Sequence, residues 1–159
     1  DDENMEEVVA KLLKDNCLTV ACAESCTGGM LASRLTSISG SSMYIKGSIV
    51  TYSNEAKMKF LDVDKEILDT KGAVSPEVAK QMAEGVRKAV GSDIGVGITG
   101  IAGPTGGTDK KPVSLVYIAV ASKDNTVVKE NVFSGDRARV RYRSTQQALE
   151  MIRQYIKNK

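Results

Sequence analysis

The sequence predicts one α/β domain in which helices cover both faces of a mixed, mostly parallel β-sheet. Short apolar segments typical of buried strands alternate with segments whose apolar residues recur at helical spacing. Near the C-terminal end, two strand-like segments are separated only by residues 123–125, which predicts a hairpin and therefore one antiparallel strand. At 159 residues the chain suits one domain, residues 1–159, rather than two.

The N-terminal part predicts two helices and two strands. Apolar residues at helical spacing indicate a first helix over residues 5–16, and a short apolar segment at 18–23 is typical of a buried strand. After a turn at 24–29, a second helix begins at Met30 and is expected to end at Gly40, and a second strand follows at 45–52.

The middle of the chain predicts three helices. A short one begins at Asn54 and another covers residues 64–71. The third has clear end signals: Ser75 caps the free amides, Pro76 suits the first helical position, and Gly91 ends the helix.

The last part of the chain predicts one more buried strand, the hairpin and a final helix. The strand at 94–98 leads into a glycine-rich loop at 100–107. The hairpin strands are expected at 112–122 and 126–133, and Asp136 is the expected cap of the last helix.

Composition excludes several classes of function. The chain has no histidine, so histidine-dependent metal sites, Ser-His-Asp triads and Cys-His dyads are ruled out. The net charge of +2 is too small to indicate nucleic acid or an anionic membrane as a partner. The cysteines Cys17, Cys22 and Cys26 are odd in number, which favours a reducing compartment over a disulfide framework. No apolar segment is long enough to span a bilayer, and the acidic start is unlike a secretory signal. We therefore expect a cytoplasmic protein.

The turn at 24–29 lies between a strand and a helix, where main-chain amides and the helix dipole favour negative charge. Gly28 and Gly29 let a ligand approach the backbone, and Ser25 is a candidate nucleophile. The same residues are also typical of a simple helix cap. Cys26 is a competing nucleophile, although no histidine is present to activate it.

The segment 52–57 follows the second strand, and strand ends of open α/β sheets gather ligands at their carboxyl edge. A lysine desolvated there has its pKa pulled toward neutrality, which makes Lys57 a candidate base for a serine. The alternative for Lys57 is a solvated surface lysine.

Two further features suggest ligand contacts. The glycine-rich segment 97–107, which leaves a buried strand, suggests exposed amides that serve a ligand. It matches neither a Walker A loop nor a dinucleotide fingerprint, and a flexible crossover loop is the alternative. Arg137 and Arg141 share one face of the last helix and are placed to bind a phosphate. The alternative is that all four arginines, with Arg139 and Arg143, coat a solvated face.

Together these segments resemble one family, the C-terminal domain of competence/damage-inducible protein A, which is also found alone as nicotinamide-mononucleotide deamidase. The matching blocks follow one another in family order. They are A-E-S-C-T-G-G (23–29), G-S-S (40–42), V-T-Y-S-N-E-A-K (50–57), G-A-V-S (72–75), G-I-T-G-I-A-G-P (97–104), K-P-V (111–113) and F-S-G-D-R (133–137).

The resemblance implies a three-layer α/β/α sandwich that hydrolyses the carboxamide of nicotinamide mononucleotide to nicotinate mononucleotide and ammonia, in pyridine-nucleotide recycling. It implies a small-molecule nucleotide as substrate, no metal and no cofactor, and dimers or higher oligomers. It also implies catalysis by a serine and a lysine.

We therefore expect Ser25 as nucleophile, Lys57 as base, and Tyr52 as the residue that orients the lysine or stacks on the pyridine ring. Main-chain amides of residues 27–29 or 99–100 are the expected oxyanion donors. The expected substrate-binding residues are Thr27, Gly28, Gly29, Ser42, Asn54, Thr99, Gly100, Gly103, Arg137 and Arg141.

Two points leave an alternative open. The family usually has glycine after K-P-V, whereas this chain has Ser114. If that glycine lets the strand pack against a loop or the ligand, the serine narrows the pocket. Many relatives carry an N-terminal domain that resembles molybdopterin-binding proteins, and in some of them deamidase activity is weak or absent. The alternative function is a non-catalytic nucleotide-binding or regulatory domain of such a two-domain protein.

Overall fold

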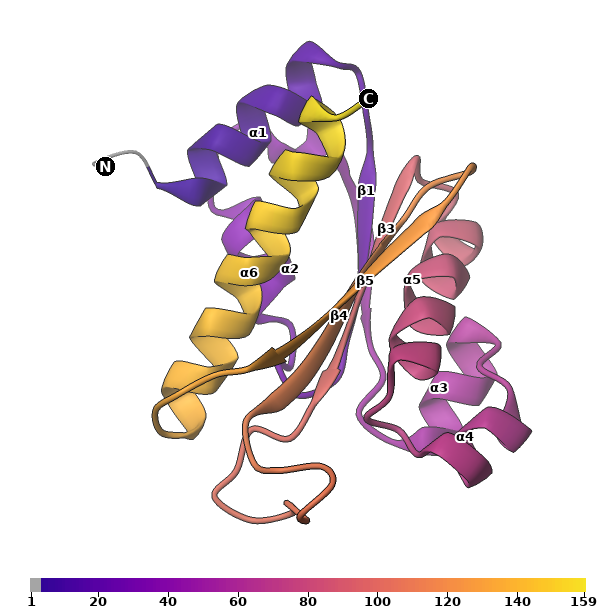
Figure 1. Ribbon diagram of the computed structural model, residues 1–159. Helices are drawn as coiled ribbons and strands as arrows, with labels where there is room; N and C mark the ends of the chain where they lie inside the picture. The colour runs from indigo at the N-terminus through magenta and orange to yellow at the C-terminus, as the bar shows by residue number, and fades with distance from the viewer. Residues whose placement is uncertain (1–3) are drawn as a thin grey trace.

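A computed structural model describes residues 4–159 and has three layers, with a five-stranded sheet between two layers of helices (Figure 1). The strand order is β2-β1-β3-β4-β5. In chain order the strands are β1 (Val20–Glu24), β2 (Ile45–Val50), β3 (Ile94–Gly100), β4 (Leu115–Ala121) and β5 (Thr126–Val132).

Four of the five strands run in the same direction. β1 is parallel to both β2 and β3, whereas β4 is antiparallel to β3 and to β5. The carboxyl ends of β1, β2 and β3 therefore meet at one edge of the sheet. The predicted mixed, mostly parallel sheet is confirmed, and so is the single antiparallel strand.

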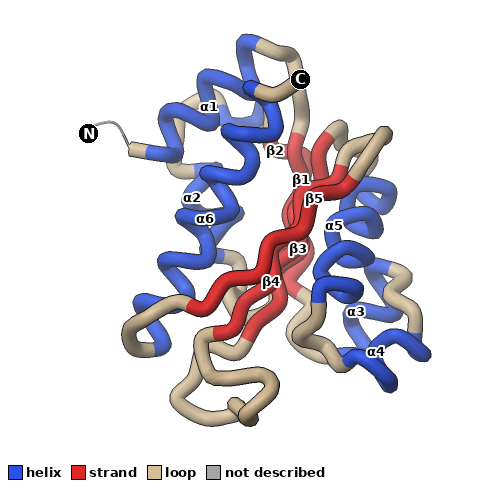
Figure 2. The backbone as a smooth tube through the Cα atoms, in the orientation of Figure 1, coloured by secondary structure: helices blue, strands red, loops and turns tan. Residues whose placement is uncertain are grey.

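The helices divide between the two faces of the sheet (Figure 2). One layer contains α1 (Met5–Asp15), α2 (Met30–Thr36) and α6 (Arg137–Lys157). The other layer contains α3 (Asn54–Leu61), α4 (Lys65–Lys71) and α5 (Pro76–Val90). The three-layer α/β/α architecture is confirmed.

Burial explains why the strands differ in pattern. The central strands β1, β3 and β4 are covered on both faces and are almost entirely buried, whereas the edge strand β2 alternates between half-buried and exposed residues. Two glycines in β3 let α5 approach closely. A Cβ atom on Gly97 would lie 2.5 Å from the carbonyl oxygen of Ala79, and one on Gly95 would collide with that of Ala83.

The predicted caps are present at three helix ends. The Ser75 hydroxyl accepts a hydrogen bond from Val78 N at 3.2 Å, and Gly91 ends α5 with a φ of 78°. The Asp136 carboxylate accepts from Arg139 N at 2.9 Å and caps α6.

The second helix is shorter than predicted. It ends at Thr36 instead of Gly40, and a short 3₁₀ helix, Ser41–Met43, follows. The hydroxyl of Thr36 donates to the carbonyl of Ala32, and that of Ser37 donates to the carbonyl of Arg34. Such side-chain bonds to the preceding turn compete with continuation of the helix.

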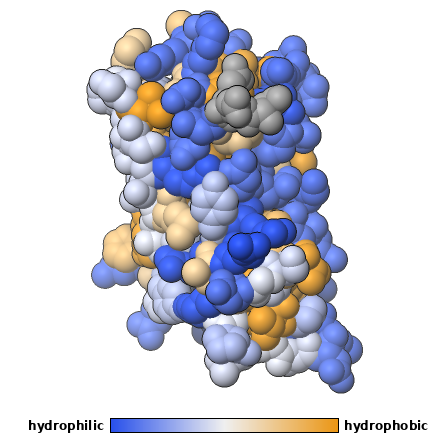
Figure 3. Space-filling model, turned by 90° about the vertical axis from the view of Figure 1, so that its left-hand side faces the viewer, coloured by the Kyte–Doolittle hydropathy of each residue, from blue (hydrophilic) through white to orange (hydrophobic). Residues whose placement is uncertain are grey.

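Within residues 4–159 no helix combines the length and the apolar character that crossing a bilayer requires. The face formed by the layer of α1, α2 and α6 is mostly hydrophilic, with small scattered apolar patches (Figure 3).

Ser114 has a left-handed backbone. Its φ is 80°, and its amide and carbonyl are fixed by Ile101 O and Phe133 N. This explains why glycine suits the position. The side chain of Ser114 is not among the residues that line the candidate site described below.

We expect Ser114→Gly to raise the free energy of unfolding by about 0.5–1 kcal/mol, because relief of a left-handed non-glycine backbone (about 1–2 kcal/mol) exceeds the entropy cost of glycine in the unfolded chain. Urea denaturation measures the change. Ser114→Ala is the matched control, since it keeps the Cβ atom. An equal gain in both variants would show that backbone strain is not the cause.

Candidate active site

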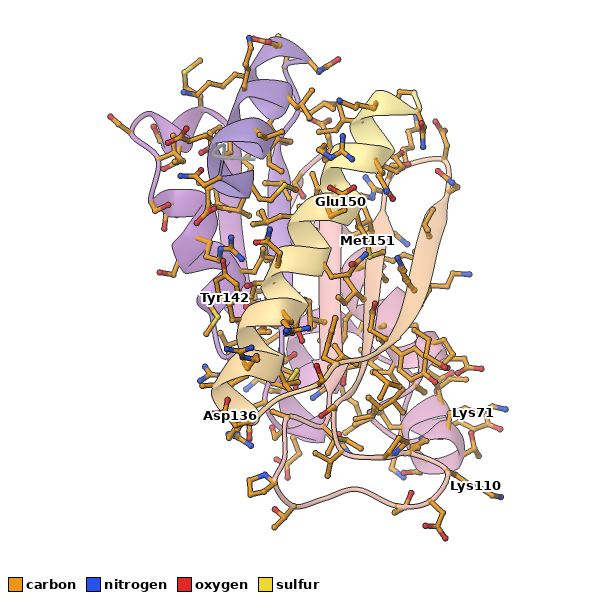
Figure 4. The ribbon with its side chains drawn as sticks, turned by 60° about the vertical axis from the view of Figure 1, so that its left-hand side comes forward. Lys71, Lys110, Asp136, Tyr142, Glu150 and Met151 are labelled. Atoms are coloured by element: carbon orange, nitrogen blue, oxygen red, sulfur yellow. The ribbon has the colours of Figure 1, made fainter. Side chains whose placement is uncertain are left out.

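A cavity of about 320 Å³ lies at the sheet edge where β1, β2 and β3 end. It is enclosed by the residues that follow these three strands, by the segment before α5 and by the start of α6. Figure 4 shows Asp136, the cap of α6, at the same end of the molecule as Lys110 in the β3–β4 loop (residues 101–114). The lining residues are Ser25, Cys26, Tyr52, Lys57, Ala73, Val74, Thr99, Gly100, Ile101, Ala102, Gly103, Thr105, Gly106 and Arg137.

The backbone of Ser25 is fixed on both sides. Its amide extends the sheet by donating to Ile98 O on β3 at 3.1 Å, and its carbonyl accepts from Gly28 N at 3.1 Å. The residue is 8% exposed, so its hydroxyl borders the cavity without being freely solvated. Local structure therefore presents this hydroxyl at the carboxyl end of β1.

Lys57 is buried beside Ser25. It comes from the first turn of α3 and is only 1% exposed, and its Nζ lies 3.1 Å from Ser25 Oγ. Desolvation of the ammonium lowers the pKa of Lys57 to about 8 from its ordinary 10.5. The alternative of a solvated surface lysine is therefore excluded by the structure.

Two main-chain carbonyls determine which way the amine faces. Lys57 Nζ donates to Thr51 O at 2.8 Å and to Tyr52 O at 3.3 Å. A neutral amine has two N–H bonds and one lone pair. When both N–H bonds are used by these carbonyls, the lone pair is left facing the Ser25 hydroxyl, which is the arrangement that a general base requires.

Cys26 is a poor nucleophile in this setting. It also lines the cavity, but it is 6% exposed, and burial raises the pKa of its thiol to about 11. The thiolate is the reactive form of cysteine, and very little of it exists at neutral pH with this pKa. The geometry thus favours Ser25 over Cys26.

Tyr52 and Arg137 form one wall of the cavity. Arg137 donates to Gly103 O at 2.8 Å and to the Tyr52 hydroxyl at 3.3 Å. Tyr52 is 65% exposed, and it is its carbonyl, not its ring, that contacts Lys57. The start of α6 is thereby tied to the β3–β4 loop.

Three expected residues of β3 and its loop line the cavity, namely Thr99, Gly100 and Gly103. The Thr99 hydroxyl donates to Ala73 O at 2.8 Å and joins β3 to the segment before α5. Because Ile101 N donates to Leu115 O on β4, the amide of Gly100 faces the opposite side, toward the end of β1. It is a candidate oxyanion donor.

Six other expected residues lie outside the lining of this cavity. They are Thr27, Gly28, Gly29, Ser42, Asn54 and Arg141. Arg141 donates instead to the carbonyls of Cys26 and Thr27, both at 3.0 Å.

Glu24 is not among the residues that the sequence predicts for the site, although its side chain holds the turn after Ser25 to the start of α2. It is fully buried, and its carboxylate accepts hydrogen bonds from the Thr27 hydroxyl at 2.6 Å, Leu31 N at 2.9 Å and Ala32 N at 3.0 Å. The start of α2 thus already holds an anion from its own chain. The signal in the sequence was an acidic residue just before a predicted helix N-terminus.

Other sites are less suited to chemistry. A larger groove of about 560 Å³ lies between β5 and the end of α6, and its lining is mainly apolar, without a nucleophile beside a base. Among residues 4–159, no group of three or more cysteine, aspartate or glutamate side chains is placed to hold a metal ion.

Comparison with known proteins identifies the family. The family described as the CinA C-terminal domain matches residues 2–156. The chain belongs to this family. It is similar to a CinA-like protein of Koribacter versatilis, with 53% identity over 154 residues that cover 97% of this chain and 37% of that protein. The chain spans 37% to 39% of the length of the curated relatives that it matches.

Solved structures of the CinA superfamily have the same fold. The competence/damage inducible protein CihA from Agrobacterium tumefaciens is 40% identical with a TM-score of 0.89, and the match covers 93% of each chain. A competence-damaged protein (CinA) superfamily protein from Klebsiella pneumoniae is 31% identical with a TM-score of 0.94, covering 99% of this chain and 100% of that one.

We expect Lys57→Met to stabilise the fold at pH 7 by about 1–2 kcal/mol. The variant avoids the cost of burying a charged amine, up to about 3 kcal/mol, and part of this gain is lost because the two carbonyls lose their donor. Between pH 8 and 10.5 the native state has lost a proton that the unfolded state retains, so the wild type gains stability there as pH rises.

Urea denaturation of both proteins at about pH 7 and pH 10 measures this difference, and charges elsewhere cancel in the comparison. The advantage of the methionine variant should shrink at the higher pH. Lys59→Met, which removes an exposed lysine of the same helix, is the control. A pH-independent advantage would show that Lys57 is not perturbed by burial.

Proposed function

We propose that this domain hydrolyses the carboxamide of nicotinamide mononucleotide, releasing ammonia and nicotinate mononucleotide. The observation that carries the proposal is the contact between the Ser25 hydroxyl and the buried Lys57 amine at the carboxyl edge of the sheet. Acyl transfer needs an activated nucleophile, and this pair provides one without histidine. The family resemblance names the substrate.

The first half of the reaction forms an acyl-enzyme. Ser25 Oγ attacks the carboxamide carbon while its proton passes to Lys57 Nζ. Negative charge develops on the carboxamide oxygen, and the Gly100 amide is the proposed donor to it; one such donor typically lowers the barrier by about 2.7–4 kcal/mol. The C–N bond then breaks, and Lys57 returns the proton to the departing ammonia.

The second half releases the acid. A water molecule attacks the acyl carbon, Lys57 accepts its proton, and that proton is then delivered to Ser25 Oγ as the ester bond breaks. Amide and water are thereby converted to acid and ammonia with Lys57 restored. Arg137, which lines the cavity, is the proposed partner of the substrate phosphate, since a guanidinium binds phosphate oxygens in pairs.

We expect Ser25→Ala and Lys57→Ala each to lower kcat by at least about 10³-fold, because either change removes the nucleophile or its base. Ammonia release from nicotinamide mononucleotide measures turnover. Cys26→Ala is the matched control at the same turn and should retain activity. Binding of the nucleotide by the wild type without any product would instead support a non-catalytic nucleotide-binding domain.

We expect kcat/KM to rise with pH and level off above a midpoint of about 8, because only neutral Lys57 accepts a proton. At pH 7 about one-tenth of the amine is neutral with such a pKa. Initial rates at low substrate concentration across about pH 6–10 give the profile. A flat profile, or one that falls above pH 8, would argue against Lys57 as the base.

A further inference from the structure

The turn that carries Ser25 is held from a distant helix. Arg141, in the second turn of α6, donates from Nε to Cys26 O and from Nη2 to Thr27 O, each at 3.0 Å. The turn itself is closed by the hydrogen bond from Gly28 N to Ser25 O. Cys26 and Thr27 are therefore the two central residues of a β-turn, and Arg141 binds the carbonyls of both.

The central peptide of a β-turn has two common orientations. Neither Cys26 nor Thr27 has a positive φ, so this turn is of type I and not type II, and the two types differ by a flip of the peptide between the central residues. The carbonyl of that peptide is Cys26 O, which Arg141 holds. The Thr27 N–H belongs to the same planar peptide and points in the opposite direction, so the guanidinium fixes its direction as well.

Gly28 gives the guanidinium room for this contact. A Cβ atom at this position would lie 3.2 Å from Arg141 Nη2, and the φ of 59° is itself left-handed. The planar fork of arginine fits two neighbouring carbonyls, whereas a lysine ammonium has a single centre of charge. Figure 4 shows that α6 extends from Asp136, at the end of the molecule where the cavity lies, past Tyr142.

We propose that Arg141 is a positioning residue for Ser25. It keeps the Ser25–Gly28 turn in the type I form. This form holds the Ser25 hydroxyl against Lys57, and it fixes the direction of the Thr27 N–H. Arg141 does not touch the cavity, so it acts through the turn and not on the substrate. The expected effect of Arg141 on kcat rests on the proposed amide hydrolysis, whereas its expected effect on the conformation of the turn does not.

Arg141→Ala is expected to lower kcat by about 10–100-fold with KM changed less than about threefold, because a misplaced nucleophile slows chemistry more than binding. Guanidinium ion at about 10–50 mM should restore part of kcat, and methylammonium should not. Arg141→Lys should remain impaired. Arg143→Ala removes the same charge nearby and is the control, since within residues 4–159 the side-chain hydrogen bonds to Cys26 O and Thr27 O come from Arg141.

An activity-independent measurement separates this inference from the proposed function. In ¹⁵N NMR spectra, the amide signals of Thr27 and Gly28 should shift or broaden in Arg141→Ala and return when guanidinium is added. If the wild type releases no ammonia, the proposed function fails, yet these signals still decide the role of Arg141. Unchanged signals, or a raised KM with normal kcat, would overturn the inference. If the alanine variant does not fold, Arg141→Lys undergoes the same measurements.

Discussion

The site depends on one interaction, the hydrogen bond between the Lys57 amine and the Ser25 hydroxyl. An ammonium with 1% exposure is costly to bury, and the fold supplies only neutral carbonyls in return, Thr51 O and Tyr52 O. Within residues 4–159, no carboxylate is among the hydrogen-bond partners of the amine. A carboxylate there would raise the pKa of Lys57 and keep it charged, whereas carbonyls satisfy its N–H groups and leave its pKa low.

The parallel part of the sheet brings the two residues together, although 32 positions separate them in the chain. β1 and β2 are adjacent and parallel, so the residues that follow Glu24 and Val50 emerge side by side. Thr51 N donates to Glu24 O, which continues the pairing beyond both strands. α3 then begins at once and returns Lys57 toward the end of β1.

Much of the fold and part of the site could be predicted from the sequence. Apolar periodicity, turn residues and caps such as Ser75 and Asp136 depend on local chemistry, so they indicate the elements correctly. The predicted end of the second helix at Gly40 lies beyond its observed end at Thr36, because glycine is a clear stop signal in a sequence whereas the side-chain bonds of Thr36 and Ser37 to the preceding turn are not. Long-range partners have no local signal. The sequence could not show that Arg141 reaches main-chain carbonyls more than 110 positions away.

The start of α2 shows why such partners change the interpretation of a motif. A helix N-terminus after a glycine pair is normally a site for a substrate anion. Here the Glu24 carboxylate occupies the amides of Leu31 and Ala32, so the positive end of the dipole is already neutralised by the chain itself. Arg141 in turn occupies the carbonyls of the preceding turn. Glu24 and Arg141 thus occupy two amides of α2 and two carbonyls of the turn before it, and these contacts hold the turn that carries Ser25. This supports Arg137, on another wall of the cavity, as the proposed partner of the substrate phosphate.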